Sequence, residues 1–297
     1  MSNGTPPSAN YTDWLTDRVL RGLLSTVMRL PFEKRVRAMG RIMSHGIGPL
    51  TGYRKRAETH LSLGYPDYST EKIRHLATAV CDNFGRTLIE NFSWREFGQR
   101  LADTTATGDG LHALEDARAT GKPVIFVTGH IGNHEASRHV LTQTGLTIGG
   151  LYRPMGNSYF NAHYAQTMSS WGGPVFAQGR QGTIGFAKHL KAGGMATLLF
   201  DVASSSGVNI PFMGHPARTA TSAADLALRM NAVVIPYFGI RKPDGFGFDV
   251  HVEAPIAPDT PEIMMTRMTE RLEARIRATP EQWFWVHRRW KQPKAKN

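Results

Sequence analysis

A histidine and a carboxylate stand five positions apart in this chain, at His130 and Glu135. They follow the apolar segment 124–127, whose sequence Val-Ile-Phe-Val is typical of a buried strand, and residues 135–141 have the propensity of a helix. His130 is therefore expected at the end of a strand, and Glu135 in a first helical turn, where the helix dipole favours a carboxylate. This spacing predicts a histidine that acts as general base and an acid that orients it.

The neighbouring histidines argue against a zinc site. A zinc-binding helix of the H-E-x-x-H type needs histidines at i and i+4, whereas His134 and His139 are five positions apart. Cys81 is the single cysteine, which leaves no cysteine cluster for a metal. We therefore expect neither a metal nor another cofactor.

Nucleophilic and phosphate-binding motifs are also missing from the sequence. Ser205 has Ala203 where a G-x-S-x-G elbow needs glycine, and the Gly-Lys pair at 121–122 lacks the earlier glycine of a P-loop. A base without a protein nucleophile suits direct transfer. In that reaction His130 takes the proton of a substrate hydroxyl that attacks an activated carbonyl, and Glu135 steadies the imidazolium.

Helix capping is the alternative explanation of the same residues. Asn133 has the side chain of a helix N-cap, and Glu135 then faces solvent in the first turn. What decides between the two explanations lies elsewhere in the chain.

Five groups of residues carry a family resemblance. They occupy positions 129–135, 152–157, 199–201, 210–219 and 280–291. Their order and approximate spacing resemble those of the bacterial lipid A late acyltransferases, a family within the lysophospholipid acyltransferase group, whose mark is an H-x4-E dyad. The resemblance runs from about Arg54 to Lys291.

The resemblance implies transfer of a fatty acyl chain from an acyl thioester, on acyl carrier protein or coenzyme A, to a hydroxyl of a membrane lipid. A sugar-based lipid A precursor is the family's default acceptor. Two departures leave the acceptor open: His134 stands where the family often has tryptophan, and Val202 where it often has glutamine. Because changes in a pocket alter which lipid fits without touching the proton-transfer pair, a lyso-aminolipid or another lysophospholipid is the alternative acceptor.

Five further residues are candidates for substrate binding: Arg153, Asn157, Arg180, Asp201 and Thr219. The guanidinium of Arg153 suits a phosphate or the charge on a thioester oxygen, and an ion pair with Asp201 is its structural alternative. Asn157 is expected to orient the loop that carries Arg153. Arg180 lies in a glycine-flanked turn that resembles an anion site before a helix, with a plain turn as the alternative. Thr219 rests on the resemblance alone.

From about Thr104 the pattern alternates between strands and helices. Strands are predicted at 124–127, 147–152, 195–200, 233–238 and 246–252, and helices at 111–119, 135–141, 159–171, 183–191, 220–230 and 261–278. This predicts an α/β fold with a mixed central sheet flanked by helices. We expect a disordered segment 1–10, a helical membrane-associating region 11–103, an acyltransferase core 104–291 and a basic tail 292–297. The resemblance places the dyad at one edge of the sheet, beside a hydrophobic acyl groove.

Residues 14–30 predict an amphipathic helix near the N-terminus. Its apolar residues are Leu15, Val19, Leu20, Leu23, Leu24 and Val27, while Asp17, Arg18 and Arg21 take the other side. The longest charge-free run, 22–28, is far shorter than the ~20 residues that cross a bilayer. Basic residues at 34, 35, 37, 41 and 54–56 favour an anionic surface. We expect a peripheral or monotopic protein on the cytoplasmic face of the bacterial inner membrane, with packing of the helix into the core as the alternative.

Composition limits the remaining classes. Lys and Arg number 35 against 24 acids, a net charge of +11, which favours anionic partners. We find no recognition helix or aromatic RNA-binding motif and expect no nucleic acid. The non-enzymatic alternative is a basic peripheral membrane or nucleic-acid binding protein. The aromatic residues among the basic ones at 283–290 fit either core packing or the lipid headgroup zone.

Overall fold

The computed structural model describes residues 10–154 and 157–290. The expected disordered segment 1–10 and basic tail 292–297 lie outside these residues, apart from Asn10. The side chain of Asn10 accepts a hydrogen bond from the Thr12 amide and so caps the first helix.

Within the described residues, seven strands form one sheet in the order β1-β9-β8-β2-β5-β3-β4. The strands are β1 (Ala106–Thr107), β2 (Val124–Thr128), β3 (Ile148–Tyr152), β4 (Val175–Ala177), β5 (Met195–Leu199), β8 (Val233–Arg241) and β9 (Phe248–Val252). Neighbouring strands are parallel except β8 and β9, which are antiparallel. The predicted mixed central sheet is confirmed.

Strand β2 lies in the middle of this sheet and is covered on both faces. Val124 and Phe126 belong to the buried cluster that includes helices α7 (Gly110–Thr120) and α8 (His134–Gln143). Ile125 and Val127 alternate with them and belong to the cluster of α11 (Ser222–Met230) and α12 (Pro261–Ala278). A continuous apolar run is what a parallel strand between two helical layers requires.

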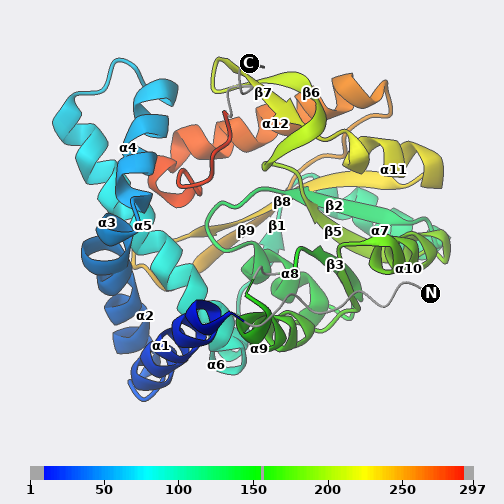
Figure 1. The fold of residues 1–297 in the computed structure, drawn as a ribbon. Coiled ribbons are helices and arrows are strands. Elements are labelled where there is room, and N and C mark those ends of the chain that lie inside the picture. The colour runs from blue at the N-terminus through cyan, green and yellow to red at the C-terminus, as the bar shows by residue number, and fades with distance from the viewer. Residues whose placement is uncertain (1–9, 155–156, 291–297) are drawn as a thin grey trace.

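Helices cover the two faces of the sheet, with α12 on one side and α8 and α9 (Ser158–Ser169) on the other (Figure 1). The remaining helix of the α/β region is α10 (Arg180–Lys191). Each helix predicted in this region is present, with ends shifted by at most three residues, and α12 has the predicted bounds.

The N-terminal part of the chain is helical and stacks at one end of the sheet (Figure 1). Its helices are α1 (Tyr11–Val27), α2 (Phe32–Arg41), the π-helix η1 (Ile42–Ile47), α3 (Gly48–Leu50), α4 (Tyr53–Gly64), α5 (Thr70–Phe92) and α6 (Trp94–Arg100). Helix α5 contributes Val80 and Cys81 to the same buried cluster as β2 and α12. No helix in the described ranges has both the length and the apolar character that a membrane crossing requires.

A two-stranded hairpin of β6 (Ala203–Phe212) and β7 (His215–Thr219) was not predicted. Pro211 and Pro216 face each other in it, and proline argues against a strand inside a sheet. A separate two-stranded ribbon tolerates them because it has free edges. Its two-residue turn, Met213 and Gly214, has positive φ at both positions, as a tight hairpin turn needs.

Candidate active site

His130 and Asp201 form the centre of the site, and the sheet register brings them together. Thr128 of β2 lies opposite Leu199 of β5, and both strands run in the same direction. Two residues beyond each strand, the His130 ring Nδ1 lies 2.7 Å from Asp201 Oδ1. The His130 backbone N–H donates to Asp201 Oδ2 at 2.7 Å. Asp201 therefore holds both the ring and the backbone of His130.

The carboxylate that accepts from His130 is Asp201, whereas the sequence assigned that place to Glu135. In the described structure no hydrogen bond joins Glu135 to His130. Glu135 Oε2 accepts from Arg138 Nε at 2.8 Å, and Oε1 lies 3.6 Å from His134 Nε2. The cause is local, because residues three apart on a helix face each other and Arg138 is one turn beyond Glu135.

The capping explanation is half right. Asn133 is the N-cap of α8, since its Oδ1 accepts from the Glu135 amide at 3.1 Å. Glu135 does not face solvent, because it is only 2% exposed. Its buried charge is compensated by Arg138, whose side chain is equally buried. Glu135 and Arg138 form a structural ion pair beneath the first turn of the helix.

The two histidines of the site, His130 and His134, have pKa values shifted in opposite directions. Burial lowers the pKa of His130, but the charge of Asp201 and its hydrogen bond outweigh this and leave the pKa above the usual 6.5. Burial lowers the pKa of His134 to about 4, so this ring is neutral near neutral pH. Burial favours protonated Asp201, yet the His130 charge and the hydrogen bonds from His130 and Trp283 hold its pKa far below the ordinary value. The pair is therefore an ionised carboxylate beside a histidine that binds a proton readily.

A segment near the C-terminus supports both members of the pair. Trp283 Nε1 donates to Asp201 Oδ2 at 2.8 Å, and the Phe284 amide donates to the His130 carbonyl at 2.9 Å. Trp283 and Trp285 are buried, so core packing is the correct explanation for these two indoles. Sequence reasoning did not find the role of Trp283 at the site. The only available signal was its position in the last of the five family-like blocks.

A buried polar network fixes the loop that carries His130. Arg241 of β8 pairs with both carboxylate oxygens of Glu90 from α5. Glu90 also accepts from Asn133 Nδ2 at 3.0 Å. Gly132 has φ +55°, and a Cβ there would lie 2.0 Å from the Gly239 carbonyl oxygen. The loop between β2 and α8 is thus held by the helical region, by β8 and by a position that only glycine fits.

Two of the predicted basic residues lie at the same edge of the sheet as the pair. Arg153 follows β3 and Arg180 begins α10 just beyond β4, and β2, β5, β3 and β4 are parallel neighbours. Both side chains are exposed. Among the described residues Arg153 makes no ion pair with Asp201, whose oxygens are held by His130 and Trp283. The same edge of the sheet therefore carries two exposed cations.

The other two predicted residues have structural partners. Asn157 Oδ1 accepts from the Tyr159 amide at 3.1 Å, and its Nδ2 donates to the Asp13 carbonyl at 2.8 Å, which ties α9 to α1. Thr219 is fully buried, and its hydroxyl accepts from Arg289 at 2.5 Å. The Thr219 side chain has no exposed surface in this structure, and its predicted contact with substrate stays a prediction.

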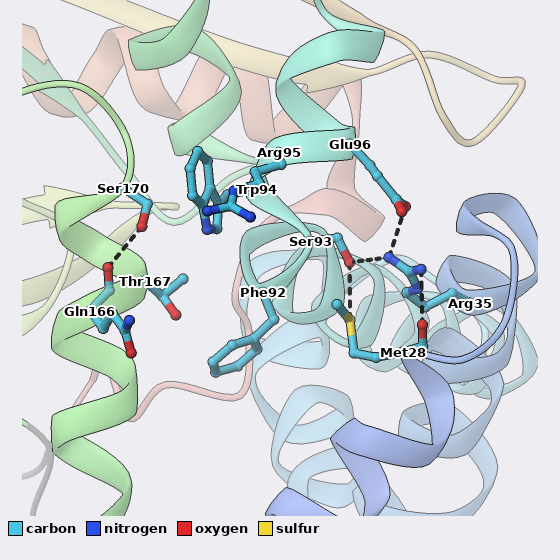
Figure 2. A pocket seen from close by; sticks show the side chains of 10 residues that line it. All are labelled: Met28, Arg35, Phe92, Ser93, Trp94, Arg95, Glu96, Gln166, Thr167 and Ser170. Atoms are coloured by element: carbon cyan, nitrogen blue, oxygen red, sulfur yellow. Dashed lines mark hydrogen bonds and ion pairs between the residues drawn. The ribbon is translucent and has the colours of Figure 1, made fainter.

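A pocket of about 400 Å³ lies apart from these residues (Figure 2). Its lining residues lie in α2, α5, α6 and α9 or directly beside the ends of α1, α5 and α9, and are Met28, Arg35, Phe92, Ser93, Trp94, Arg95, Glu96, Gln166, Thr167 and Ser170. Figure 2 shows Arg35 directed at Ser93 and Glu96, which it binds at 2.9 Å each. None of the predicted site residues lines this pocket. In the described ranges no cluster of three His, Cys, Asp or Glu side chains is placed to hold a metal ion.

The paired histidine and carboxylate lie at the strand ends of an α/β sheet, which is where such sheets bind ligands. A comparison with known families identifies the class: the model described as "Bacterial lipid A biosynthesis acyltransferase" matches residues 7–292. The chain belongs to this family and is an acyltransferase.

Curated relatives agree with the family assignment. The chain is 27% identical over 292 residues to "Lipid A biosynthesis lauroyltransferase" of Escherichia coli (strain K12), covering 94% of this chain and 92% of that protein. A "Lipid A biosynthesis acyltransferase" of Haemophilus influenzae is 24% identical over 243 residues, covering 78% of this chain and 74% of that protein. A second Haemophilus influenzae protein with the same description is 24% identical over 270 residues, or 84% of each chain.

Proposed function

We propose that this protein transfers a fatty acyl chain from an acyl thioester to a hydroxyl of a membrane lipid, with His130 as general base. The observation that carries the proposal is the 2.7 Å contact between His130 Nδ1 and Asp201 Oδ1. It commits Nδ1 to the carboxylate and leaves Nε2 to accept a proton. His130 keeps 35% of its side-chain surface exposed, which gives a substrate access to the ring.

The reaction proceeds by direct attack. His130 Nε2 takes the proton of the acceptor hydroxyl as its oxygen forms a bond to the thioester carbonyl carbon. The imidazolium is stabilised by Asp201 and then delivers the proton to the departing sulfur as the C–S bond breaks. Arg153, at the neighbouring strand end, binds the oxyanion or a phosphate of the substrate, because a guanidinium suits both. Arg180 adds positive charge at the same edge.

The proposed acceptor is a lipid A precursor, as the family and the relatives' names suggest. The alternative acceptor is a lyso-aminolipid or another lysophospholipid. Two positions next to the pair bear on the choice: His134, whose ring centroid is 5.7 Å from that of His130, and Val202, which is 40% exposed beside Asp201. Both carry residues that differ from those often found in the family, and we propose that both line the acceptor site.

The proposed donor is acyl carrier protein, with coenzyme A as the alternative. Acyl carrier protein is acidic, and a net charge of +11 with exposed Arg153 and Arg180 at the site favours its docking. No cofactor takes part in the proposed reaction.

The proposed location is the cytoplasmic face of the inner membrane, with peripheral attachment through α1. Its N-terminal half exposes apolar residues at helical spacing, namely Tyr11, Trp14, Leu15 and Val19. Arg18 lies over the Trp14 ring at 5.6 Å, which adds a cation to the same face. The C-terminal half instead buries Leu24 and Val27 against the protein. Helix α1 thus has one end suited to an anionic lipid surface and one end packed as core.

A reconstituted transfer assay tests the proposal. Purified protein is given acyl carrier protein or coenzyme A thioesters with a lipid A precursor, a lyso-aminolipid or a lysophospholipid in mixed micelles, and products are identified by mass spectrometry. We expect one product that carries one acyl chain more than its acceptor, and we expect His130→Ala not to form it. Equal product from wild type and His130→Ala would refute the mechanism.

The lipids of a deletion strain provide an independent test. We expect one fully acylated lipid to disappear and its underacylated form to accumulate. An unchanged lipid profile would contradict the proposed acceptor class.

A further inference from the structure

Asp201 has one hydrogen-bond donor in the described structure that does not belong to His130, and that donor is the indole of Trp283. Asp201 is 2% exposed. Its Oδ1 accepts from the His130 ring, and its Oδ2 accepts from the His130 backbone at 2.7 Å and from Trp283 Nε1 at 2.8 Å. Because both Asp201 oxygens are bound by donors, two from His130 and one from Trp283, the carboxylate is held with Oδ1 toward the imidazole.

The chemistry of the indole suits this place. An indole N–H donates and cannot accept, so it does not compete for the proton of His130. It is also neutral, whereas an arginine there would cancel the negative charge that stabilises the imidazolium. Trp283 is 1% exposed, and its ring packs against Trp285 and Phe212 with centroid distances of 4.7 and 5.1 Å. The donor is therefore held in one direction by packing.

Two consecutive residues clamp the two strand ends together. The Trp283 side chain binds Asp201 after β5, and the Phe284 amide binds the His130 carbonyl after β2 at 2.9 Å. Trp283 also forms an isolated bridge with Ile131, which follows His130 in the chain. The separation of His130 from Asp201 is thus set by the strand register and by the segment that carries Trp283.

We propose that Trp283 is a positioning residue that acts through Asp201, fixing the carboxylate so that His130 keeps the tautomer and the proton affinity that transfer needs. This inference rests on the proposed function for its kinetic consequence. Its structural consequence, a coupling between the Trp283 indole and the His130 ring, holds whatever the reaction is.

The matched variants are Trp283→Phe and Trp285→Phe. Both remove a buried indole from the same aromatic cluster, but Trp285 Nε1 donates to the Pro280 carbonyl and not to the pair. With one donor lost, Asp201 binds the imidazolium more strongly, so in Trp283→Phe the acid limb of kcat/KM moves to higher pH by about half a pH unit. We expect kcat to fall about tenfold, with little change in KM, because the carboxylate is less well oriented. Trp285→Phe leaves the midpoint in place, and equal midpoints in the two variants would overturn the proposal.

A measurement on the wild-type protein needs neither activity nor a folded variant. The indole N–H resonances are followed by NMR while the His130 ring is titrated. Each indole is assigned by selective isotope labelling and by its nuclear Overhauser contacts. We expect the Trp283 resonance to shift with the midpoint of His130 and the Trp285 resonance to stay flat. A flat Trp283 resonance would overturn the proposal. Absence of transfer with every donor would refute the proposed function while this titration still decides the role of Trp283.

Discussion

The end of strand β5 and the first turn of helix α8 each place one buried carboxylate near His130. Asp201, from β5, accepts two hydrogen bonds from His130, whereas Glu135, from α8, pairs with Arg138. Both carboxylates are at most 2% exposed. The difference lies in what positions them: strand register places Asp201 beside a residue 71 positions away, and helical periodicity turns Glu135 toward its own helix. The carboxylate that is distant in sequence therefore contacts the histidine, and the near one pairs within its own helix.

Removal of the Asp201 charge tests this comparison with the largest expected effect. In Asp201→Asn the two donors at Oδ2 keep the amide oxygen there, so the NH2 group faces His130 Nδ1 and forces the wrong tautomer. We expect kcat to fall by about 10³- to 10⁴-fold, as for loss of the carboxylate in other oriented histidines, with the fold intact by circular dichroism. A variant within tenfold of wild type would show that Asp201 does not orient the base.

Neutralisation of Glu135 is the complementary test. Glu135→Gln leaves Arg138 charged and buried, and we expect the free energy of unfolding in urea to fall by about 3 kcal/mol. The double variant with Arg138→Met removes both charges and should recover most of that loss. Transfer per folded molecule is expected to stay within about tenfold of wild type. Unchanged stability together with lost transfer would instead make Glu135 the residue that His130 depends on.

The sequence predicted helices and strands that have a local pattern of apolar residues. It did not predict the side-chain contacts between elements that are distant in the sequence. Strand β2 and helix α12 were predicted because a continuous apolar run and a long periodic pattern are local signals. The hydrogen bond from His130 to Asp201 depends on the register of β2 against β5, and nothing in either segment alone specifies it. Asp201 itself entered through the family resemblance, as a substrate-binding residue.

The same limit applies to the contacts of the other predicted site residues. Thr219 lies in a family-like block, but its side chain is buried and binds Arg289, which is 70 residues away. Glu135 was assigned to His130 because its five-residue spacing from the histidine is visible in the sequence. The competing partner one helical turn later, Arg138, was visible too, and weighing it by the i to i+3 rule points to the ion pair that the structure shows.

The pH dependence of transfer is a further test of the contact between Asp201 and His130, with a smaller expected effect than the Asp201 and Glu135 variants. His130 must be neutral to accept a proton, and Asp201 raises its pKa, so kcat/KM should rise with pH through a midpoint above 6.5. The same interaction stabilises the fold fully below pH 6.5, and this contribution is lost as pH rises through the folded-state pKa. Wild type should therefore exceed Asp201→Asn in unfolding free energy by more at pH 6 than at pH 8. A difference that grows with pH would contradict an imidazolium held by Asp201.

His134 offers the smallest expected effect and the most specific one. Its ring lies edge-on to His130 and is neutral because burial lowers its pKa to about 4, so it presents a hydrogen-bonding edge but no charge beside His130. His134→Trp restores the residue often found in the family and leaves the His130–Asp201 contact untouched. We expect the ratio of kcat/KM between a lipid A precursor and a lyso-aminolipid to change about tenfold, mainly through KM, because pocket shape discriminates acceptors by one or two kcal/mol. His134→Phe is the control for ring size. An unchanged ratio in both variants would place acceptor choice elsewhere, with Val202 as the next position because it flanks Asp201 on the exposed side.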